Sequence, residues 1–158
     1  MKKLLILTLF FGKLAIFSQS EKSELRVFTF EKVEMLQQQK PKPILIFTYT
    51  DWCKICFGMK KTTFKNEEII RLLNEKFYFI YLNGEEKKDI AFLGKIFKYK
   101  PTGANTGTHE LATELSTVKK IIAYPTTIIL NTAFEIDAQL VGFYTAQKMT
   151  RIILQYLH

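Results

Sequence analysis

The sequence predicts an α/β domain in which a central β-sheet is covered by helices. Its 158 residues are 47% hydrophobic and 14% aromatic, which is enough to form one core. Short apolar runs bounded by proline or polar residues alternate with segments whose apolar residues recur at helical spacing. Neither a repeat nor a low-complexity linker divides the chain, so we expect a single domain.

The first 20 residues, MKKLLILTLFFGKLAIFSQS, are typical of a secretory signal peptide. Two lysines precede an apolar run, and Ser18 and Ser20 offer small residues for cleavage near position 18 or 20. The alternatives are a buried helix or a membrane anchor, but an anchor usually needs ~20 apolar residues and Lys13 interrupts this shorter run. We therefore expect a periplasmic or secreted domain over residues 21–158, with no stable membrane span after cleavage.

A helix and a buried strand are predicted to open this domain. In FTFEKVEMLQQQK, the residues Phe30, Val33 and Leu36 fall along one side of a helix. Two prolines end that helix, and the apolar run from Ile44 to Tyr49 predicts a strand.

Two further helices and a second strand are predicted to follow. The segment from Cys53 to about Phe64 has a helical pattern, and Asn66 is a suitable N-cap for the helix after it. The run FYFIYLN then predicts the second strand.

The stretch from Gly84 to Lys120 is less regular than the rest of the chain. It predicts a helix near Lys88–Phe97, a turn-rich segment KPTGANTGT, and a short helix that begins near His109. We expect Thr108 to cap the short helix and His109 to lie on its solvated face.

Two strands and a helix are predicted to complete the domain. AYPTTIIL predicts a third strand entered through Pro125, and EIDAQLVGF predicts a fourth. Thr145 is a suitable N-cap for the last helix, whose apolar residues recur at the spacing of a core-facing stripe.

Both cysteines of the chain lie in TDWCKICFGMKK, after the first predicted strand. Cys53 falls at the start of the predicted helix, where free backbone N–H groups and the helix dipole stabilise a thiolate. Lys54 adds a positive charge beside it. Cys56 lies on the same helical face, at a spacing that satisfies disulfide geometry. Cys53 can therefore attack a disulfide, and Cys56 can resolve the mixed disulfide that results.

Two other roles compete with this redox dithiol. A structural disulfide that closes so short a loop would add little stability, because the entropic benefit grows with loop length. A structural zinc site needs four ligands, and the chain's two histidines are His109, in the irregular stretch, and His158, at the C-terminus. We therefore expect no metal site.

The charge distribution argues against a nucleic-acid partner. The formal net charge is +8, but the basic residues are scattered and form runs no longer than pairs such as Lys60–Lys61. A nucleic-acid binder would need a basic stripe with aromatic platforms. Scattered lysines indicate a solvated surface instead.

In its motifs and their order the chain resembles the thioredoxin superfamily, in particular the exported bacterial thioredoxin-like thiol–disulfide oxidoreductases. Trp52 directly before the CxxC motif and Pro125 directly before a strand carry the resemblance, which covers roughly residues 28–158. It implies a thioredoxin-like fold, with a central mixed β-sheet flanked by helices. Residues of about 84–120 would form a helical insertion before the strand that follows the family's cis-proline.

The resemblance implies a role for each residue of the motif. Cys53 would be the nucleophile and Cys56 the resolving cysteine. The disulfide between them would be the redox group, so no bound cofactor is expected. Lys54 and Ile55, the pair between the cysteines, would tune the reduction potential.

The resemblance also implies a substrate-binding edge beside the dithiol. The Tyr124–Pro125 bond would be cis, and the exposed backbone of Tyr124 would pair with an extended segment of a protein substrate. The alternative is a trans proline that opens a strand. Trp52 would shield the sulfur and contact substrate, or else serve as a half-buried packing residue.

The chain departs from thioredoxin at the position of its buried acid. Phe47 stands where the family's acid helps to deprotonate the resolving cysteine, and Tyr81 stands where a lysine partners that acid. The usual proton route is therefore missing.

These observations predict a thiol–disulfide oxidoreductase that acts on protein thiols or disulfides outside the cytoplasm. We expect it to act as a reductant that receives its electrons from a redox partner there. One alternative is a non-enzymatic module that binds a partner protein or a soft metal such as Cu(I) through the cysteines. Another is a structural module whose cysteines stay oxidised.

Overall fold

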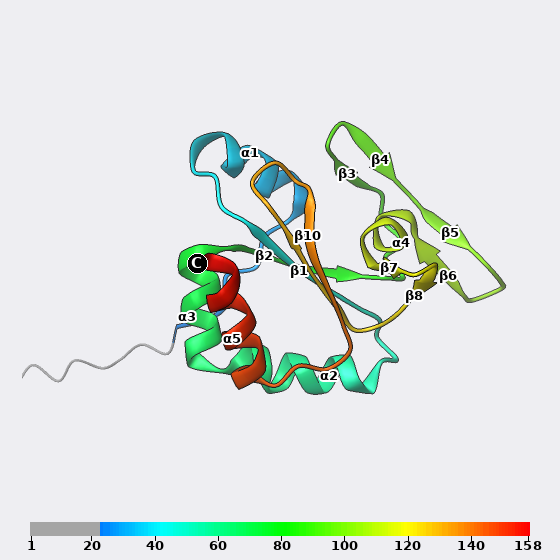
Figure 1. Ribbon diagram of the computed structural model, residues 1–158. Helices are drawn as coiled ribbons and strands as arrows, with labels where there is room; N and C mark the ends of the chain where they lie inside the picture. The colour runs from blue at the N-terminus through cyan, green and yellow to red at the C-terminus, as the bar shows by residue number, and fades with distance from the viewer. Residues whose placement is uncertain (1–22) are drawn as a thin grey trace, which may run out of the picture.

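The computed structural model describes residues 23–158 and shows a four-stranded mixed sheet with helices on both faces (Figure 1). The predicted signal peptide lies outside these residues. The strand order is β10-β9-β1-β2, in which β1 and β2 are parallel and the other two pairs are antiparallel. The predicted fold class, a thioredoxin-like mixed sheet flanked by helices, is confirmed.

The helices are α1 (Phe30–Gln39), α2 (Lys54–Lys61), α3 (Glu67–Lys76), α4 (Glu110–Ser116) and α5 (Ala146–Leu157), with a 3-10 turn η1 (Thr63–Lys65). The sheet contains β1 (Ile44–Tyr49), β2 (Tyr78–Asn83), β9 (Thr126–Leu130) and β10 (Ile136–Val141). Three hairpins lie outside the sheet: β3 (Ile90–Phe92) with β4 (Lys95–Phe97), β5 (Tyr99–Pro101) with β6 (Gly107–His109), and β7 (Thr117–Val118) with β8 (Ile121–Ile122). Within residues 23–158, every helix is too short or too polar to cross a membrane.

The helix starts follow the capping chemistry of the sequence. Asn66 Oδ1 accepts hydrogen bonds from the N–H groups of Glu68 and Ile69, and Thr145 Oγ1 accepts one from Lys148. These side chains satisfy backbone donors that have no partner inside the helix. Both predicted caps are confirmed.

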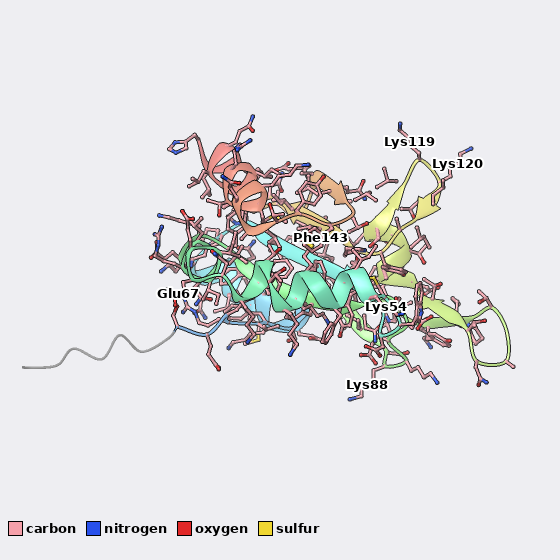
Figure 2. The ribbon with its side chains drawn as sticks, turned by 90° about the horizontal axis from the view of Figure 1, so that it is seen from below. Lys54, Glu67, Lys88, Lys119, Lys120 and Phe143 are labelled. Atoms are coloured by element: carbon pink, nitrogen blue, oxygen red, sulfur yellow. A yellow bond between two sulfur atoms is a disulfide. The ribbon has the colours of Figure 1, made fainter. Side chains whose placement is uncertain are left out.

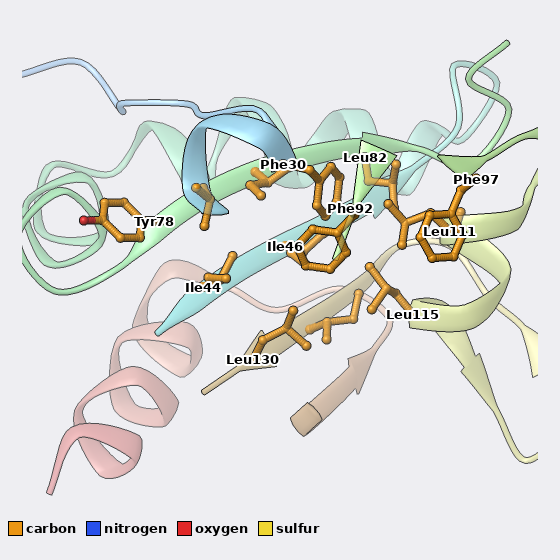
Figure 3. Close-up of a cluster of buried hydrophobic side chains, with 14 residues drawn as sticks. Phe30, Ile44, Ile46, Tyr78, Leu82, Phe92, Phe97, Leu111, Leu115 and Leu130 are labelled. Carbon is orange, nitrogen blue, oxygen red and sulfur yellow. The ribbon is translucent and has the colours of Figure 1, made fainter. Parts of the chain in front are cut away.

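One face of the sheet is covered by α1, the β3–β4 hairpin and α4 (Figure 3). The buried side chains there come from every one of these elements and from the sheet, and include Phe30, Ile46, Leu82, Phe92 and Leu111. This cluster holds the irregular stretch of the sequence against the central strands.

The opposite face is covered by α2, α3 and α5. Its buried cluster includes Phe47 from β1, Leu73 from α3 and Met149 from α5, and it also contains both cysteines. The dithiol segment is therefore part of a core and is supported by the packing beneath it.

Residues 84–120 contain one helix, α4, and are otherwise built from hairpins. The predicted helix at Lys88–Phe97 is wrong, because this segment folds as the β3–β4 hairpin. Leu93 and Gly94 both have positive φ, at 51° and 74°, and form a two-residue turn between the paired residues Phe92 and Lys95. Two-residue turns of this kind match the twist of paired strands. The prediction from helical periodicity did not take this turn into account.

Buried hydrogen bonds fix α4 to the sheet. Ser116 Oγ donates to Thr48 Oγ1 at 2.9 Å, and Thr48 Oγ1 donates to the carbonyl of Thr126 at 3.0 Å. At the other end of the helix, the N–H of His109 donates to the carbonyl of Gly84. The insertion is thereby tied to β1 and to the residue that follows β2.

Candidate active site

The two sulfur atoms lie where β1 passes through a turn into α2. Cys53 is the N-cap of α2, and Cys56 is in the first turn of that helix. The two residues form a disulfide, with their Cα atoms 5.2 Å apart. The spacing of the motif thus brings the pair together as predicted.

The two cysteine residues differ in their exposure to solvent. Cys53 is 7% exposed and Cys56 only 1%. The N–H of Cys56 donates to Cys53 Sγ at 3.1 Å, at the positive end of the α2 dipole. Cys53 is therefore the more exposed of the two cysteines, and the start of the helix stabilises negative charge on its sulfur.

Trp52 and Tyr124 form the wall beside the disulfide. Trp52 is 67% exposed, and its ring meets that of Tyr124 edge to face, with centroids 6.4 Å apart. Trp52 Nε1 donates to Glu85 Oε1 at 3.1 Å, which fixes the indole over the loop after β2. Of the two roles considered for Trp52, its exposure fits substrate contact.

The loop that enters β9 carries Tyr124 and Pro125. The Tyr124–Pro125 peptide bond is cis, and the carbonyl of Pro125 accepts a hydrogen bond from the N–H of Gly142 at 2.8 Å. Tyr124 packs against the cluster that contains both cysteines. Burial raises the pKa of its phenol to about 12, with the charge of Glu85 acting in the same direction. The loop predicted to present substrate therefore lies against the dithiol core.

Lys54 and Ile55 are exposed in the first turn of α2, and Phe143, also exposed, lies near Gly58 on the same helix (Figure 2). Their side chains form the outer surface next to the disulfide. Lys119 and Lys120 stand at the tip of the β7–β8 hairpin, which leads directly into the Tyr124 loop.

The position of the family's buried acid is fully apolar here. Phe47 is buried and lies opposite Tyr81 in the β1–β2 register, with ring centroids 6.0 Å apart. Burial raises the pKa of Tyr81 to about 12, so its phenol is not a base at neutral pH. The two positions noted in the sequence thus face each other across β1 and β2.

Lys60 lies near the disulfide and was not predicted as a site residue from the sequence. Its Nζ lies over the rings of Tyr49 and Tyr81, and it lines a small cavity together with Cys53. Burial lowers its pKa to about 8, against the opposing charge of Asp51. The signal was its position seven residues after Cys53, which places both on one face of α2.

His109 has a structural role, and the predicted solvated position for it is wrong. Its side chain is fully buried, and Nδ1 accepts a hydrogen bond from the N–H of Leu111, so His109 and not Thr108 caps α4. The two glutamates of α4 form exposed ion pairs, Glu110 with Lys100 and Glu114 with Lys95.

A mixed sheet with helices on both faces and a CxxC disulfide at a helix start are features of a thioredoxin-like domain. The family described as "Thioredoxin-like domain" matches residues 30–157. The chain belongs to this family. A mouse protein, "Spermatogenesis-associated protein 20", is 38% identical over 53 residues; this stretch is 34% of the present chain and 7% of the mouse protein's length.

Solved structures show the same fold at low sequence identity. A thioredoxin from Thermus thermophilus superposes with a TM-score of 0.60 at 17% identity, covering 85% of this chain and 88% of that one. A putative disulphide-isomerase from Bacteroides thetaiotaomicron has a TM-score of 0.58 at 19% identity, covering 89% and 98%. These similarities establish the fold, and the site itself must carry the argument for function.

Proposed function

We propose that the chain is a thiol–disulfide oxidoreductase that reduces disulfides of protein substrates outside the cytoplasm. The observation that carries this proposal is the Cys53–Cys56 disulfide at the start of α2, in which Cys53 is the more exposed residue. Membership of the thioredoxin-like family supports it. The signal-peptide pattern of residues 1–20 supports the location.

The chemistry needs only the two cysteines and a substrate disulfide. The Cys53 thiolate attacks one substrate sulfur, a mixed disulfide forms, and the other substrate sulfur leaves as a thiolate. Cys56 then attacks Cys53 Sγ, which restores the internal disulfide and releases the second substrate thiolate. Two electrons pass from the protein to the substrate, with the disulfide as the redox group and no bound cofactor. A redox partner outside the cytoplasm would return the protein to its reduced form.

Trp52 and the Tyr124–Pro125 loop form the proposed substrate edge. Trp52 offers an exposed ring for apolar contact, and the loop offers its backbone to an extended segment. In this position a substrate disulfide would lie over Cys53. Lys54 and Ile55, exposed between the cysteines, would tune the potential of the pair.

The reduction potential of the pair tests both the activity and its direction. The mature protein is equilibrated in glutathione buffers, and its free thiols are counted by alkylation and mass. A value near ~−270 mV, as in thioredoxin, is expected for a reductant, whereas ~−120 to −180 mV would overturn the reducing direction. Failure of the pair to exchange with glutathione, together with stoichiometric Cu(I) binding, would replace the enzyme by a metal-binding module.

A trapping variant tests the assignment of the two sulfurs. Cys56→Ser should form a stable mixed disulfide with a disulfide-bonded protein such as insulin, because the resolving thiol is absent. Cys53→Ser should form none. Equal trapping by both variants would contradict the assignment.

A further inference from the structure

A small cavity lies beside the disulfide, and neither Trp52 nor Tyr124 lines it. Its volume is about 70 Å³, and it is lined by Tyr49, Thr50, Asp51, Cys53, Phe57 and Lys60. Of these, Cys53 is the reacting residue and Lys60 the only cation. The cavity therefore connects a redox sulfur with a lysine side chain.

The cavity has a mixed lining, in which polar groups lie among apolar ones. Thr50 is 2% exposed, and its Oγ1 makes no hydrogen bond within residues 23–158. The volume is large enough for water, which needs several polar partners to be held in such a place. Thr50, Asp51 and Lys60 supply hydroxyl, carboxylate and ammonium groups. Lys60 and Cys53 therefore line the same small cavity, so a charge on Lys60 can act on Cys53 across it.

The groups that face Lys60 hold its Nζ at this place. The rings of Tyr49 and Tyr81 lie beneath it, Asp51 lies in the turn before the motif, and Glu86 is near Tyr49. Aromatic faces attract a cation, and partial desolvation strengthens that attraction. Nζ is thus kept beside the cavity and does not extend freely into solvent.

We propose that Lys60 is the positive charge that stabilises the Cys53 thiolate in the reduced protein. This inference rests on the proposed function of the pair. Lys60 would compensate for the uncharged Phe47–Tyr81 pair of β1 and β2. The family's strand positions therefore do not carry this role here, and a residue of α2 does.

The protonation of the pair follows from this arrangement. Reduction adds two electrons from an incoming dithiol and one proton, and yields a Cys53 thiolate with a Cys56 thiol. Lys60 already carries its proton at neutral pH, since its pKa is about 8 in the disulfide form. The positive charge of Lys60 stabilises the thiolate of the reduced form, whereas the disulfide is uncharged and gains nothing from it. Lys60 therefore favours the reduced form and raises the reduction potential of the pair.

Replacement of Lys60 tests the proposal directly. Lys60→Met keeps the aliphatic contact with the tyrosine rings and removes the charge. We expect the acid dissociation constant of the Cys53 thiol, followed by thiolate ultraviolet absorbance, to fall about tenfold. The equilibrium with glutathione should shift about tenfold toward the disulfide, which corresponds to ~30 mV. Lys60→Arg should retain most of the wild-type values, because it keeps a positive charge at the same place.

Lys61→Met is the matched control, since Lys61 is also on α2 but lies over the Phe57 ring and does not line the cavity. Lys61→Met should leave unchanged both the acid dissociation constant of the Cys53 thiol and the equilibrium with glutathione. The proposal is overturned if Lys60→Met leaves the acid dissociation constant of the Cys53 thiol unchanged, or if Lys61→Met shifts that constant by the same amount. Lys60→Gln, a polar alternative of similar length, answers the same question if the Met variant does not fold.

The two proposals fail in different ways. If wild type exchanges with glutathione but does not reduce insulin, the proposed function fails while the effect of Lys60 on the thiol is still measured. If the wild-type protein reduces insulin and Lys60→Met leaves the acid dissociation constant of the Cys53 thiol unchanged, only the proposed role of Lys60 is contradicted.

Discussion

Tyr124 packs its ring so closely against the backbone of Gly84 that a Cβ at position 84 would overlap the phenol. Gly84 directly follows β2, and its N–H donates to the carbonyl of Tyr49 at the end of β1. The two residues thus join the end of the parallel strand pair to the loop before β9. Tyr124 in turn meets Trp52, so this contact supports the wall of the site.

Gly84→Ala should therefore displace Tyr124 and disturb the site. We expect a loss of about 1–3 kcal/mol in the free energy of unfolding, as for other overpacked positions. Denaturant unfolding measures this loss. Trp52 is the single tryptophan of the chain, so its intrinsic fluorescence should report the shift of the Tyr124 ring.

Gly58→Ala provides the control for this substitution. Gly58 lies inside α2, and a Cβ there would meet only Phe143, at 4.0 Å. Alanine should leave stability unchanged or raise it by about 0.5–1 kcal/mol, because glycine weakens a helix interior. A Gly84→Ala variant as stable as wild type would mean that Tyr124 moves away without cost.

Alkylation of the reduced protein should distinguish its two thiols. Cys53 is the more exposed residue and lies at the positive end of α2, whereas Cys56 is almost completely buried. We expect iodoacetamide to modify Cys53 at least about tenfold faster at neutral pH, since only the accessible thiolate reacts. Peptide mass analysis locates the label. In denaturant the two rates should become similar, and a preference for Cys56 in the native protein would reverse the assigned roles.

The sequence was sufficient to predict the central sheet and the motif within it. Apolar runs bounded by proline mark β1 and β9, and Asn66 and Thr145 mark the starts of α3 and α5. These signals are local, because each depends on a few adjacent residues. The pairing of Cys53 with Cys56 is also local, since the two cysteines are three positions apart in the sequence and lie on one helix face.

The features that were missed depend on contacts between distant segments. The Lys88–Phe97 stretch has apolar residues that fit a helix, and only the turn at Leu93–Gly94 shows that it folds back on itself. His109 is polar, and its burial results from packing of the insertion onto the sheet. Lys60 becomes a site residue because two tyrosines from separate strands lie beneath it.

His109 should contribute to stability through its cap. His109→Ala removes the acceptor for the Leu111 N–H and leaves a gap in a fully buried position. We expect a loss of about 2–4 kcal/mol in the free energy of unfolding. His109→Asn keeps an oxygen that can cap α4 and should lose less. Equal losses for the two variants would show that volume, and not the hydrogen bond, is what matters at this position.

The stability of the disulfide form should rise and then fall with pH in the alkaline range. Burial lowers the pKa of Lys60 to about 8, whereas an unfolded lysine has a pKa of ~10.4. Between these values the unfolded chain binds more protons than the folded one, so the free energy of unfolding increases with pH. Burial also raises the pKa of Tyr81, Tyr124 and Tyr156 to about 12, above the ~10 of an unfolded tyrosine. Above pH ~10 the unfolded chain therefore loses protons that the folded chain keeps, and stability decreases.

Urea unfolding of the oxidised protein from pH 7 to 11 measures this profile without titration of the thiols. Lys60→Met should flatten most of the rise between pH 8 and 10, because the burial of that ammonium no longer opposes folding at the lower pH. Tyr156→Phe should leave the rise intact and lessen the later fall, since burial and the hydrogen bond to Asp137 raise the pKa of that phenol. A rise of unchanged size in Lys60→Met would show that the ammonium is well solvated in the folded protein. In that case its position over Tyr49 and Tyr81 would not be the persistent one that a charge partner of Cys53 requires.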